Sequence, residues 1–276
     1  MFALSDLLTI AVDATENGIP YLHASLDLDR YDDVAQLLAE TIAVRRIRNR
    51  RLLRVWRDHA LGGDDNPIDA RDERVLQESL LENVGTPDAP ASDEHLHGFV
   101  AESLWLEIVE HVPMGPGTPV RVEGHDWSST DPGGDGLTIY RQAEDLSFRL
   151  WESKYHGADT PVRDSVNLAC RQINERALKY LARFSLVEQQ ITDDRVLALF
   201  YSRLPELWAN RDPAAGVGIA VSAADADGSV FDRVSNYFEL DAAQHQGHLS
   251  VTGDFPGFAS KVKESLWSGC GSWNAH

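Results

Sequence analysis

The chain has 276 residues, with 25 Lys and Arg against 44 Asp and Glu, and a formal net charge of −19. Its hydrophobic fraction of 43% is typical of a globular protein and excludes a wholly disordered acidic chain. It has no run of about 20 apolar residues and no basic, apolar leader, so we expect a cytoplasmic protein with no membrane span. The two cysteines are too few for a disulfide framework or a thiolate zinc site. Taken alone, the acidity disfavours nucleic-acid binding.

The first 90 residues are predicted to form an accessory or docking region of α+β type. Alternating apolar residues predict strands at 7–13 and 19–27, and helical spacing predicts one long helix over about 31–59. Residues 61–93 are rich in Gly, Pro and Asp around a short helix. We therefore place a domain boundary near residue 90, with a second domain over 91–276.

The second domain is predicted to be α/β, with a mixed sheet flanked by helices. In chain order the pattern predicts a helix at 92–111, strands at 119–125, 137–142 and 146–155, helices at 162–184 and 193–210, strands at 216–223 and 248–252, and a helix at 256–267. The helix at 92–111 is apolar on nearly every side, which indicates an interior position. Any acid on that helix is therefore expected to be partly buried.

The strands at 137–142 and 146–155 carry the residues that point to chemistry. A hairpin turn centred between Ala143 and Glu144 places Asp135 opposite Glu152. Cross-strand neighbours have Cβ atoms about 4.5–5.5 Å apart, so the two carboxylates can share one cation. Oxygen ligands favour Mg²⁺ or Mn²⁺ over zinc. Lys154 shares the face of Glu152, where an ammonium can hold water and offset charge on a phosphate.

These residues resemble a known nuclease superfamily. A helix, a strand, a strand opened by Asp, a strand ending in Glu-x-Lys and a further helix form the pattern of the PD-(D/E)xK restriction-endonuclease-like core. More narrowly, Gly-Gly-Asp-Gly-Leu-Thr-Ile-Tyr at 133–140 and Phe-Arg-Leu-Trp-Glu-Ser-Lys-Tyr-His at 148–156 resemble HamA nuclease subunits of Hachiman anti-phage defence systems. The resemblance covers residues 97–156, and the Pro that gives the superfamily its name is missing before Asp135.

The resemblance implies a metal-dependent DNA nuclease, an effector held in check by a HamB-type helicase. It implies that Asp135 and Glu152 bind Mg²⁺ or Mn²⁺ with the backbone carbonyl of Ser153, and that Lys154 positions or activates water. Such folds often add an acid from the first core helix, for which Glu102 and Glu107 both qualify, with Glu102 preferred. Two loop histidines, His125 and His156, are expected to lie near the phosphate path.

An arginine-rich segment reverses the sign of the charge locally. Residues 45–57 contain seven arginines and no acid. Four of them fall on one stripe of the predicted helix: Arg46, Arg50, Arg54 and Arg57. The stripe is suited to following a nucleic-acid backbone, to docking on an acidic surface of this protein or a partner, or to lying as a solvated face.

Other functions compete with the helicase-regulated nuclease. The chain has no Gly-x-x-x-x-Gly-Lys-Ser/Thr motif, so we expect no nucleotide cofactor in it. A stand-alone restriction or repair nuclease of the same fold is one alternative. A non-catalytic interaction module, in which Glu152 and Lys154 form a structural ion pair, is the other.

Overall fold

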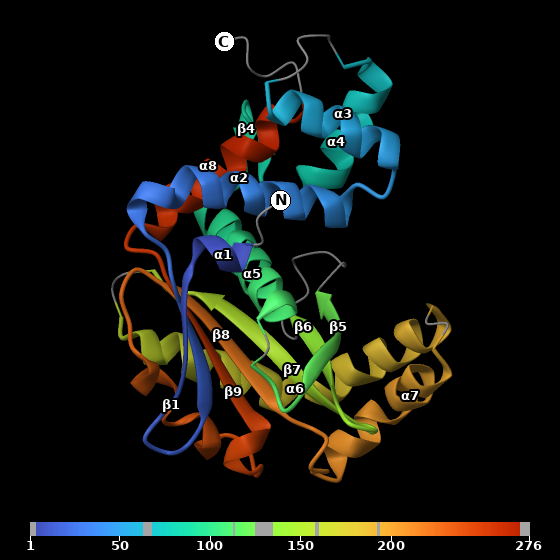
Figure 1. Cartoon of the computed structure of the whole chain (residues 1–276), viewed down its shortest axis with the longest axis vertical. Coiled ribbons are helices and arrows are strands. Elements are labelled where there is room, and N and C mark those ends of the chain that lie inside the picture. The colour runs from blue at the N-terminus through green and yellow to red at the C-terminus, as the bar shows by residue number, and fades with distance from the viewer. Residues whose placement is uncertain are drawn as a thin grey trace.

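A seven-stranded sheet runs through the chain. The computed structural model describes residues 4–62, 68–112, 114–124, 135–157, 160–191 and 194–270. In these ranges the strand order is β1-β2-β9-β8-β7-β6-β5 (Figure 1). The strands are β1 (Thr9–Ala14), β2 (Pro20–Ser25), β5 (Thr118–Gly124), β6 (Gly136–Gln142), β7 (Asp145–Tyr155), β8 (Val217–Ala223) and β9 (His245–Val251), with a separate pair, β3 (Gly85–Thr86) and β4 (Ala89–Pro90).

Helices flank the sheet and form a lobe above it in Figure 1. They are α1 (Leu4–Leu7), α2 (Tyr31–Arg46), α3 (Arg50–Ala60), α4 (Ala70–Leu80), α5 (Asp93–His111), α6 (Val162–Ile191), α7 (Arg195–Ala209) and α8 (Phe255–Ser268). Short 3-10 turns are η1 (Leu28–Arg30), η2 (Gly228–Phe231), η3 (Val234–Asn236) and η4 (Ala242–Gln244). The fold is therefore mixed α/β, as the sequence predicts.

The predicted hairpin register is confirmed. β6 and β7 are antiparallel, and Leu137 pairs with Leu150 while Ile139 pairs with Phe148. β7, β8, β9 and β2 are parallel neighbours, whereas β1 and β5 form antiparallel edges. Antiparallel neighbours need only a tight turn, but the parallel β7–β8 pair needs a long crossover, which α6 and α7 supply.

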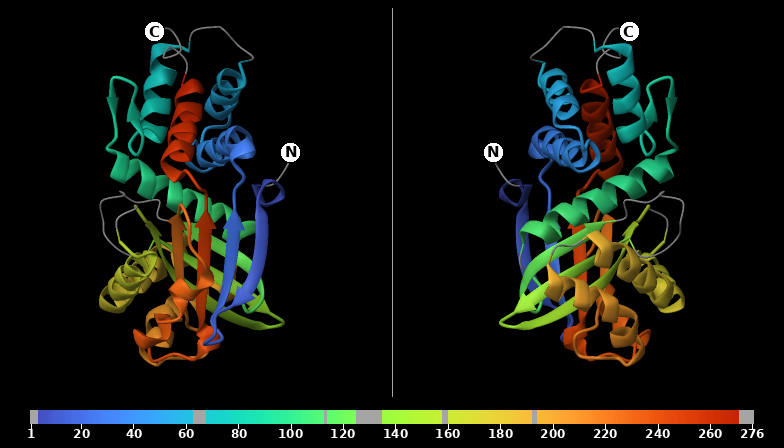
Figure 2. Two further views of the ribbon diagram at one scale, coloured as in Figure 1. Left: turned by 90° about the vertical axis from the view of Figure 1, so that its left-hand side faces the viewer. Right: turned by 90° about the vertical axis from the view of Figure 1, so that its right-hand side faces the viewer.

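The two faces of the sheet pack on different helices. Leu137 and Leu150 belong to the core beneath α6 and α7. Trp151, the next residue along β7, packs instead on Trp105 of α5, with ring centroids 5.2 Å apart. Side chains alternate between faces along a strand, which explains this division. The side views in Figure 2 show α5 crossing between the sheet and the helical lobe, and α6 on the opposite side of the sheet.

The N-terminal strands belong to this same sheet. β2 pairs in parallel with β9, bringing Leu22 opposite His248. α2 packs on α8, and one hydrophobic core joins residues of α1, α2, α3, α4, α5, α8 and β2. The sheet and the helical core therefore both include residues from each side of the expected boundary at residue 90.

The prediction of one helix over 31–59 is wrong. α2 ends at Arg46, Ile47 is extended, and α3 begins at Arg50. The Asn49 side chain accepts hydrogen bonds from the N–H groups of Arg51 and Leu52, at 2.9 and 3.3 Å. Asn is a strong N-cap residue, so the second helix starts here. In the described part of the chain, no helix combines the length and apolarity needed to cross a bilayer.

Candidate active site

Asp135 lies where β6 and β7 separate. The last residue pair between these strands is Gly136 and Trp151. The next β7 residue whose N–H points toward β6 is Ser153, and β6 has no backbone carbonyl opposite it. The Asp135 carboxylate replaces the missing backbone acceptor, with Oδ2 2.5 Å from the Ser153 nitrogen. The N–H and C=O of one strand residue point to the same side. The Ser153 carbonyl therefore also faces the Asp135 side.

Gly136 allows α5 to approach the start of β6. A Cβ at this position would lie 2.4 Å from a ring carbon of Trp105 and 2.8 Å from the Glu123 carbonyl oxygen. Real Cβ atoms do not tolerate such contacts, so a side chain here would push α5 away from the sheet. The glycine after Asp135 thus permits the close packing of α5 on the start of β6.

Glu152 and Lys154 form an ion pair at the end of β7. The Lys154 Nζ is 2.5 Å from Glu152 Oε1, and the two side chains are 22% and 0% exposed. Burial disfavours the charge on Lys154, but the nearby Asp135 and Glu152 carboxylates outweigh it and raise its pKa above the ordinary value. Lys154 therefore remains an ammonium at neutral pH.

The Asp135 carboxyl has an environment that disfavours its charge. Burial raises its pKa, and this effect outweighs the opposing effects of the Lys154 charge and the Ser153 N–H. A nearby cation would favour the ionised form. The ionisation of Asp135 is therefore sensitive to any cation placed beside it.

Asp135 and Lys154 line a pocket together with one side of α5. The pocket has a volume of about 410 Å³ and is also lined by Ser92, Glu94, His95, Gly98, Phe99, Glu102 and Ser153. The charge of Glu102 contributes to raising the pKa of Lys154. Of the two acids proposed from the sequence, the structure thus brings Glu102 to the pocket.

Glu107 faces a different part of the molecule. Its Oε2 is 3.3 Å from Arg45, and its Oε1 is 3.3 Å from His111 Nδ1. Glu107, Glu110 and His111 are the one group of three His, Cys, Asp or Glu residues in the described ranges whose ligand atoms all lie within 4.8 Å. Arg45 pairs with both acids of that group, which supplies positive charge without a metal.

The fit of a metal to the predicted ligands rests on their chemistry. Asp135, Glu152 and Glu102 offer only oxygen atoms, the ligand type that Mg²⁺ and Mn²⁺ prefer. Within the described residues, their carboxylate oxygens do not all lie within 4.8 Å of one another. The ligands thus fit these ions in chemical type but are not gathered into one site, and Lys154 supplies the positive charge beside Glu152.

The pocket residues of α5 were missed by the sequence reasoning, except Glu102. His95 lies on this side of the helix, with Nε2 3.3 Å from Asn83 Oδ1. Gly98 and Glu102 follow at helical spacings of three and four residues, which place them on the same side. Counting back from Glu102 by four and then three residues would therefore have identified Gly98 and His95 from the sequence.

The two predicted loop histidines differ in what the structure shows. His156 is 9% exposed, and its Nδ1 is 3.0 Å from Ser165 Oγ of α6. Its backbone N–H donates to the Ser222 carbonyl. The His156 ring is therefore held within the packing of β7 on α6. His125 lies outside the described residues.

The predicted arginine stripe is divided between two helices. Arg46 ends α2, with its guanidinium 5.5 Å from the Phe99 ring centroid, whereas Arg50, Arg54 and Arg57 lie on α3. Arg57 pairs with Glu40 at 2.8 Å, while Arg50 and Arg54 are exposed. The turn at 47–49 redirects the chain between Arg46 and the rest, so the single stripe predicted for one helix is wrong.

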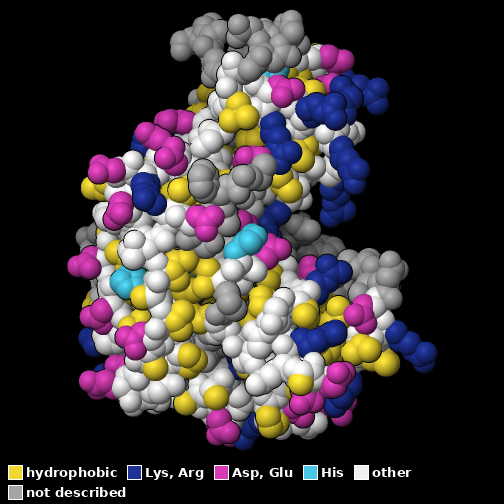
Figure 3. Space-filling model, viewed as in Figure 1, with side chains coloured by type: hydrophobic (Ala, Val, Ile, Leu, Met, Phe, Trp, Pro, Cys, Tyr) yellow, Lys and Arg dark blue, Asp and Glu magenta, His cyan; other side chains and the backbone are white. Residues whose placement is uncertain are grey.

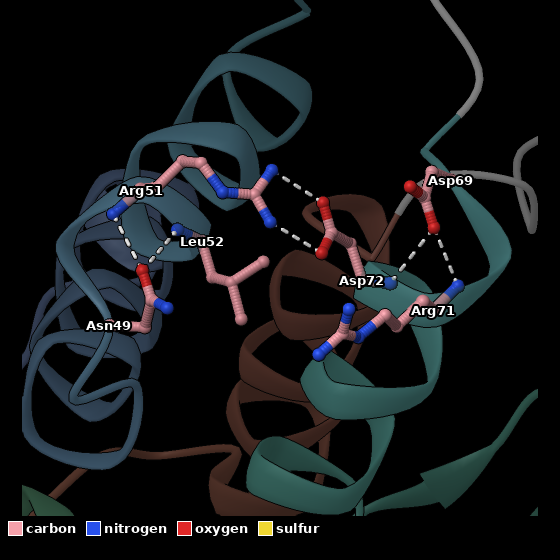
Figure 4. Close-up of polar contacts among 6 residues, drawn as sticks. All are labelled: Asn49, Arg51, Leu52, Asp69, Arg71 and Asp72. Atoms are coloured by element: carbon pink, nitrogen blue, oxygen red, sulfur yellow. Dashed lines mark hydrogen bonds and ion pairs between the residues drawn. The ribbon is translucent and has the colours of Figure 1, made fainter.

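Arg51 has a structural partner in the next helix. Its two terminal nitrogens lie 2.6 and 2.5 Å from the Asp72 carboxylate of α4, and the Asp69 side chain caps that helix (Figure 4). Two parallel N–H···O bonds fix the relative orientation of the groups. Arg51 therefore joins α3 to α4. In Figure 3, basic side chains gather along the outer edge of the upper lobe.

Comparisons of the chain with protein-family models and with curated proteins gave no match.

Proposed function

We propose that the chain is a metal-dependent nuclease with a PD-(D/E)xK core that hydrolyses phosphodiester bonds in DNA. The observation that carries the proposal is the meeting of Asp135, Lys154 and Glu102 in one pocket, with Glu152 directly behind Lys154. The order α5, β5, β6, β7, α6 and β8, with β8 parallel to β7, supports this core.

The residues divide the chemistry between them. Asp135, Glu152 and the Ser153 carbonyl, helped by Glu102, would hold Mg²⁺ or Mn²⁺, which when bound lowers the pKa of water and polarises the phosphate. The Lys154 ammonium orients the attacking water and offsets negative charge developing on the phosphate. Glu152 keeps that ammonium in place through the 2.5 Å contact.

The biological setting follows from the sequence resemblance. By that resemblance, the nuclease would be a HamA-like effector of an anti-phage defence system and would work with a HamB-type helicase. The net charge of −19 supports dependence on a partner, because an acidic chain has weak intrinsic attraction to DNA. A helicase gene next to this one distinguishes the setting from a stand-alone nuclease.

Plasmid cleavage tests the proposal. We expect the purified chain to cut plasmid with Mg²⁺ or Mn²⁺, alone or with the helicase, and to lose at least about 100-fold of that activity in Glu152→Gln and in Lys154→Met. Arg171→Ala on α6 is the control, since α6 covers the other face of the sheet. Equal cleavage by the wild type and all three variants would refute the assignment of Glu152 and Lys154 to a nuclease active site.

Calorimetry separates the nuclease from a non-catalytic interaction module. A non-catalytic module would also contain the buried Glu152–Lys154 ion pair, so the pair itself does not distinguish the two functions. Metal binding is therefore measured in addition to cleavage. A nuclease site should bind Mn²⁺ in the wild type and lose that binding in Asp135→Ala. An interaction module should give no Mn²⁺ heat that depends on Asp135.

A further inference from the structure

A second pocket adjoins the candidate active site along α5. It has a volume of about 200 Å³ and is lined by residues of α2, α5 and β5, including Arg45, Arg46, Leu106 and Val122. The two pockets share Phe99 and Glu102. Together they line one side of α5 from Glu94 to Leu106. The twelve steps of 1.5 Å from Glu94 to Leu106 span about 18 Å, so this α5 groove is longer than a single phosphate group.

Gly98 lines the α5 groove and lies in the interior of a helix of 19 residues. Glycine destabilises a helix interior relative to alanine. Gly98 is exposed, and a Cβ built on it would meet nothing within 4 Å. No neighbouring group of this chain therefore requires glycine at position 98. Gly136 differs, because a Cβ there would clash with Trp105. A bare backbone position is suited to the close approach of a ligand.

Each of the two pockets has a positive group in its lining. Lys154 lines one pocket, and Arg46 lines the other, with its guanidinium 5.5 Å from the centroid of the Phe99 ring that both pockets share. Arg45 is engaged differently, because it pairs with Glu107 and Glu110. The lining also carries acids, namely Glu94, Glu102, Glu123 and Asp135. Of these, Asp135 and Glu102 are the ones that a metal ion would neutralise under the proposed function.

We propose that a nucleic-acid strand lies along the α5 groove, with its sugar–phosphate backbone against Gly98 and a phosphate next to the scissile one on Arg46. This inference rests on the proposed function and adds the course of the substrate through the site. An acidic peptide also carries negative charge, but it offers no phosphodiester to Asp135 and Lys154. The occupant of the groove is therefore a nucleic acid.

Binding measurements with matched variants test the course of the strand. The probes are fluorescein-labelled single-stranded and double-stranded oligonucleotides, with Ca²⁺ replacing Mg²⁺ to limit cleavage, and the readout is anisotropy over a range of salt concentrations. Gly98→Leu should weaken binding by about tenfold at every salt concentration. Arg46→Ala should reduce the slope of log affinity against log salt by about 1, because one phosphate contact is lost.

Controls separate groove occupancy from loss of folding. Gly98→Ala should unfold at a temperature no lower than the wild type, yet still weaken oligonucleotide binding. Ala182→Leu and Arg171→Ala change exposed positions of α6, which covers the opposite face of the sheet, and should leave binding unchanged. Mn²⁺ binding should be the same in Gly98→Leu as in the wild type.

Three outcomes would overturn the inference: wild-type oligonucleotide affinity in Gly98→Leu, absence of oligonucleotide binding by the wild type both alone and with the helicase, or equal competition by a polyglutamate peptide of the same charge. The first outcome together with Lys154-dependent cleavage would leave the nuclease intact and refute only the strand's course. Weakened binding in Gly98→Leu without cleavage by the wild type would refute the nuclease and retain the groove.

Discussion

At the scale of single residues, the site depends on one buried carboxylate and one ammonium. Glu152 is fully buried, and its partner Lys154 is 22% exposed at the edge of the pocket. Burying a charge is costly unless an opposite charge remains beside it. The two residues are thus mutually dependent for stability as well as for the proposed chemistry.

A double-mutant cycle should reveal this dependence. Lys154→Met should lower the free energy of unfolding by about 3 kcal/mol, because it removes the ammonium beside the buried Glu152 carboxylate. Glu152→Leu combined with Lys154→Met should recover most of that loss. Urea unfolding of the wild type, both single variants and the double variant measures the coupling. Additive losses would contradict the buried pair.

At the scale of secondary-structure elements, the break between α2 and α3 redistributes the arginines. Asn49 caps α3, and the extended Ile47 turns the chain, so Arg46 faces α5 while Arg51 faces α4. The cap is therefore part of what places Arg46 beside Phe99. Helical periodicity alone does not reveal it, because the apolar spacing continues on both sides of the turn.

The cap can be tested without touching the site. Asn49→Ala should reduce the free energy of unfolding by about 1 kcal/mol, because the Arg51 and Leu52 N–H groups lose their acceptor. Asn49→Asp keeps a side-chain oxygen and should cost much less. Denaturant unfolding measures both. Equal losses in the two variants would show that the cap hydrogen bonds contribute little.

At the scale of the whole molecule, the parallel strands at the centre of the sheet bring an early segment of the chain next to a late one. β2 lies beside β9, and α2 packs on α8. His248 of β9 is buried here, with Nε2 2.9 Å from Ser250 Oγ. Burial, with a smaller effect of His23, lowers the pKa of His248 to about 3. Folding at this junction is therefore linked to pH.

The direction of that linkage gives a further prediction. An unfolded histidine has a pKa near 6.5, so below that pH the unfolded chain binds a proton that folded His248 excludes until about pH 3. The free energy of unfolding that neutral, buried His248 contributes is fully present above pH 6.5. It declines as the pH falls below 6.5, by up to about 1.4 kcal/mol per pH unit. Stability measured from pH 7 to 4 should decline less steeply in His248→Gln than in the wild type.

The sequence determined the hairpin and its faces because these depend on local rules. Side chains alternate along a strand, and a tight turn fixes the register, so the pairing of Leu137 with Leu150 was predictable. The course of α5 was predictable for the same reason, from helical spacing and the Ser92 cap. The start of β9 was missed because His245 and Gln246 are polar although buried.

Only the tertiary structure decided which distant groups share the site. Glu102 and Glu107 are both on α5, and their assignment to different pockets depends on how the helix rotates against the sheet and α2. The burial of His156, the separation of Arg46 from the α3 arginines and the pairing of β2 with β9 likewise depend on packing between segments far apart in sequence. Local periodicity specifies which side of an element is apolar, whereas the identity of its neighbour is fixed by the packing of the whole chain.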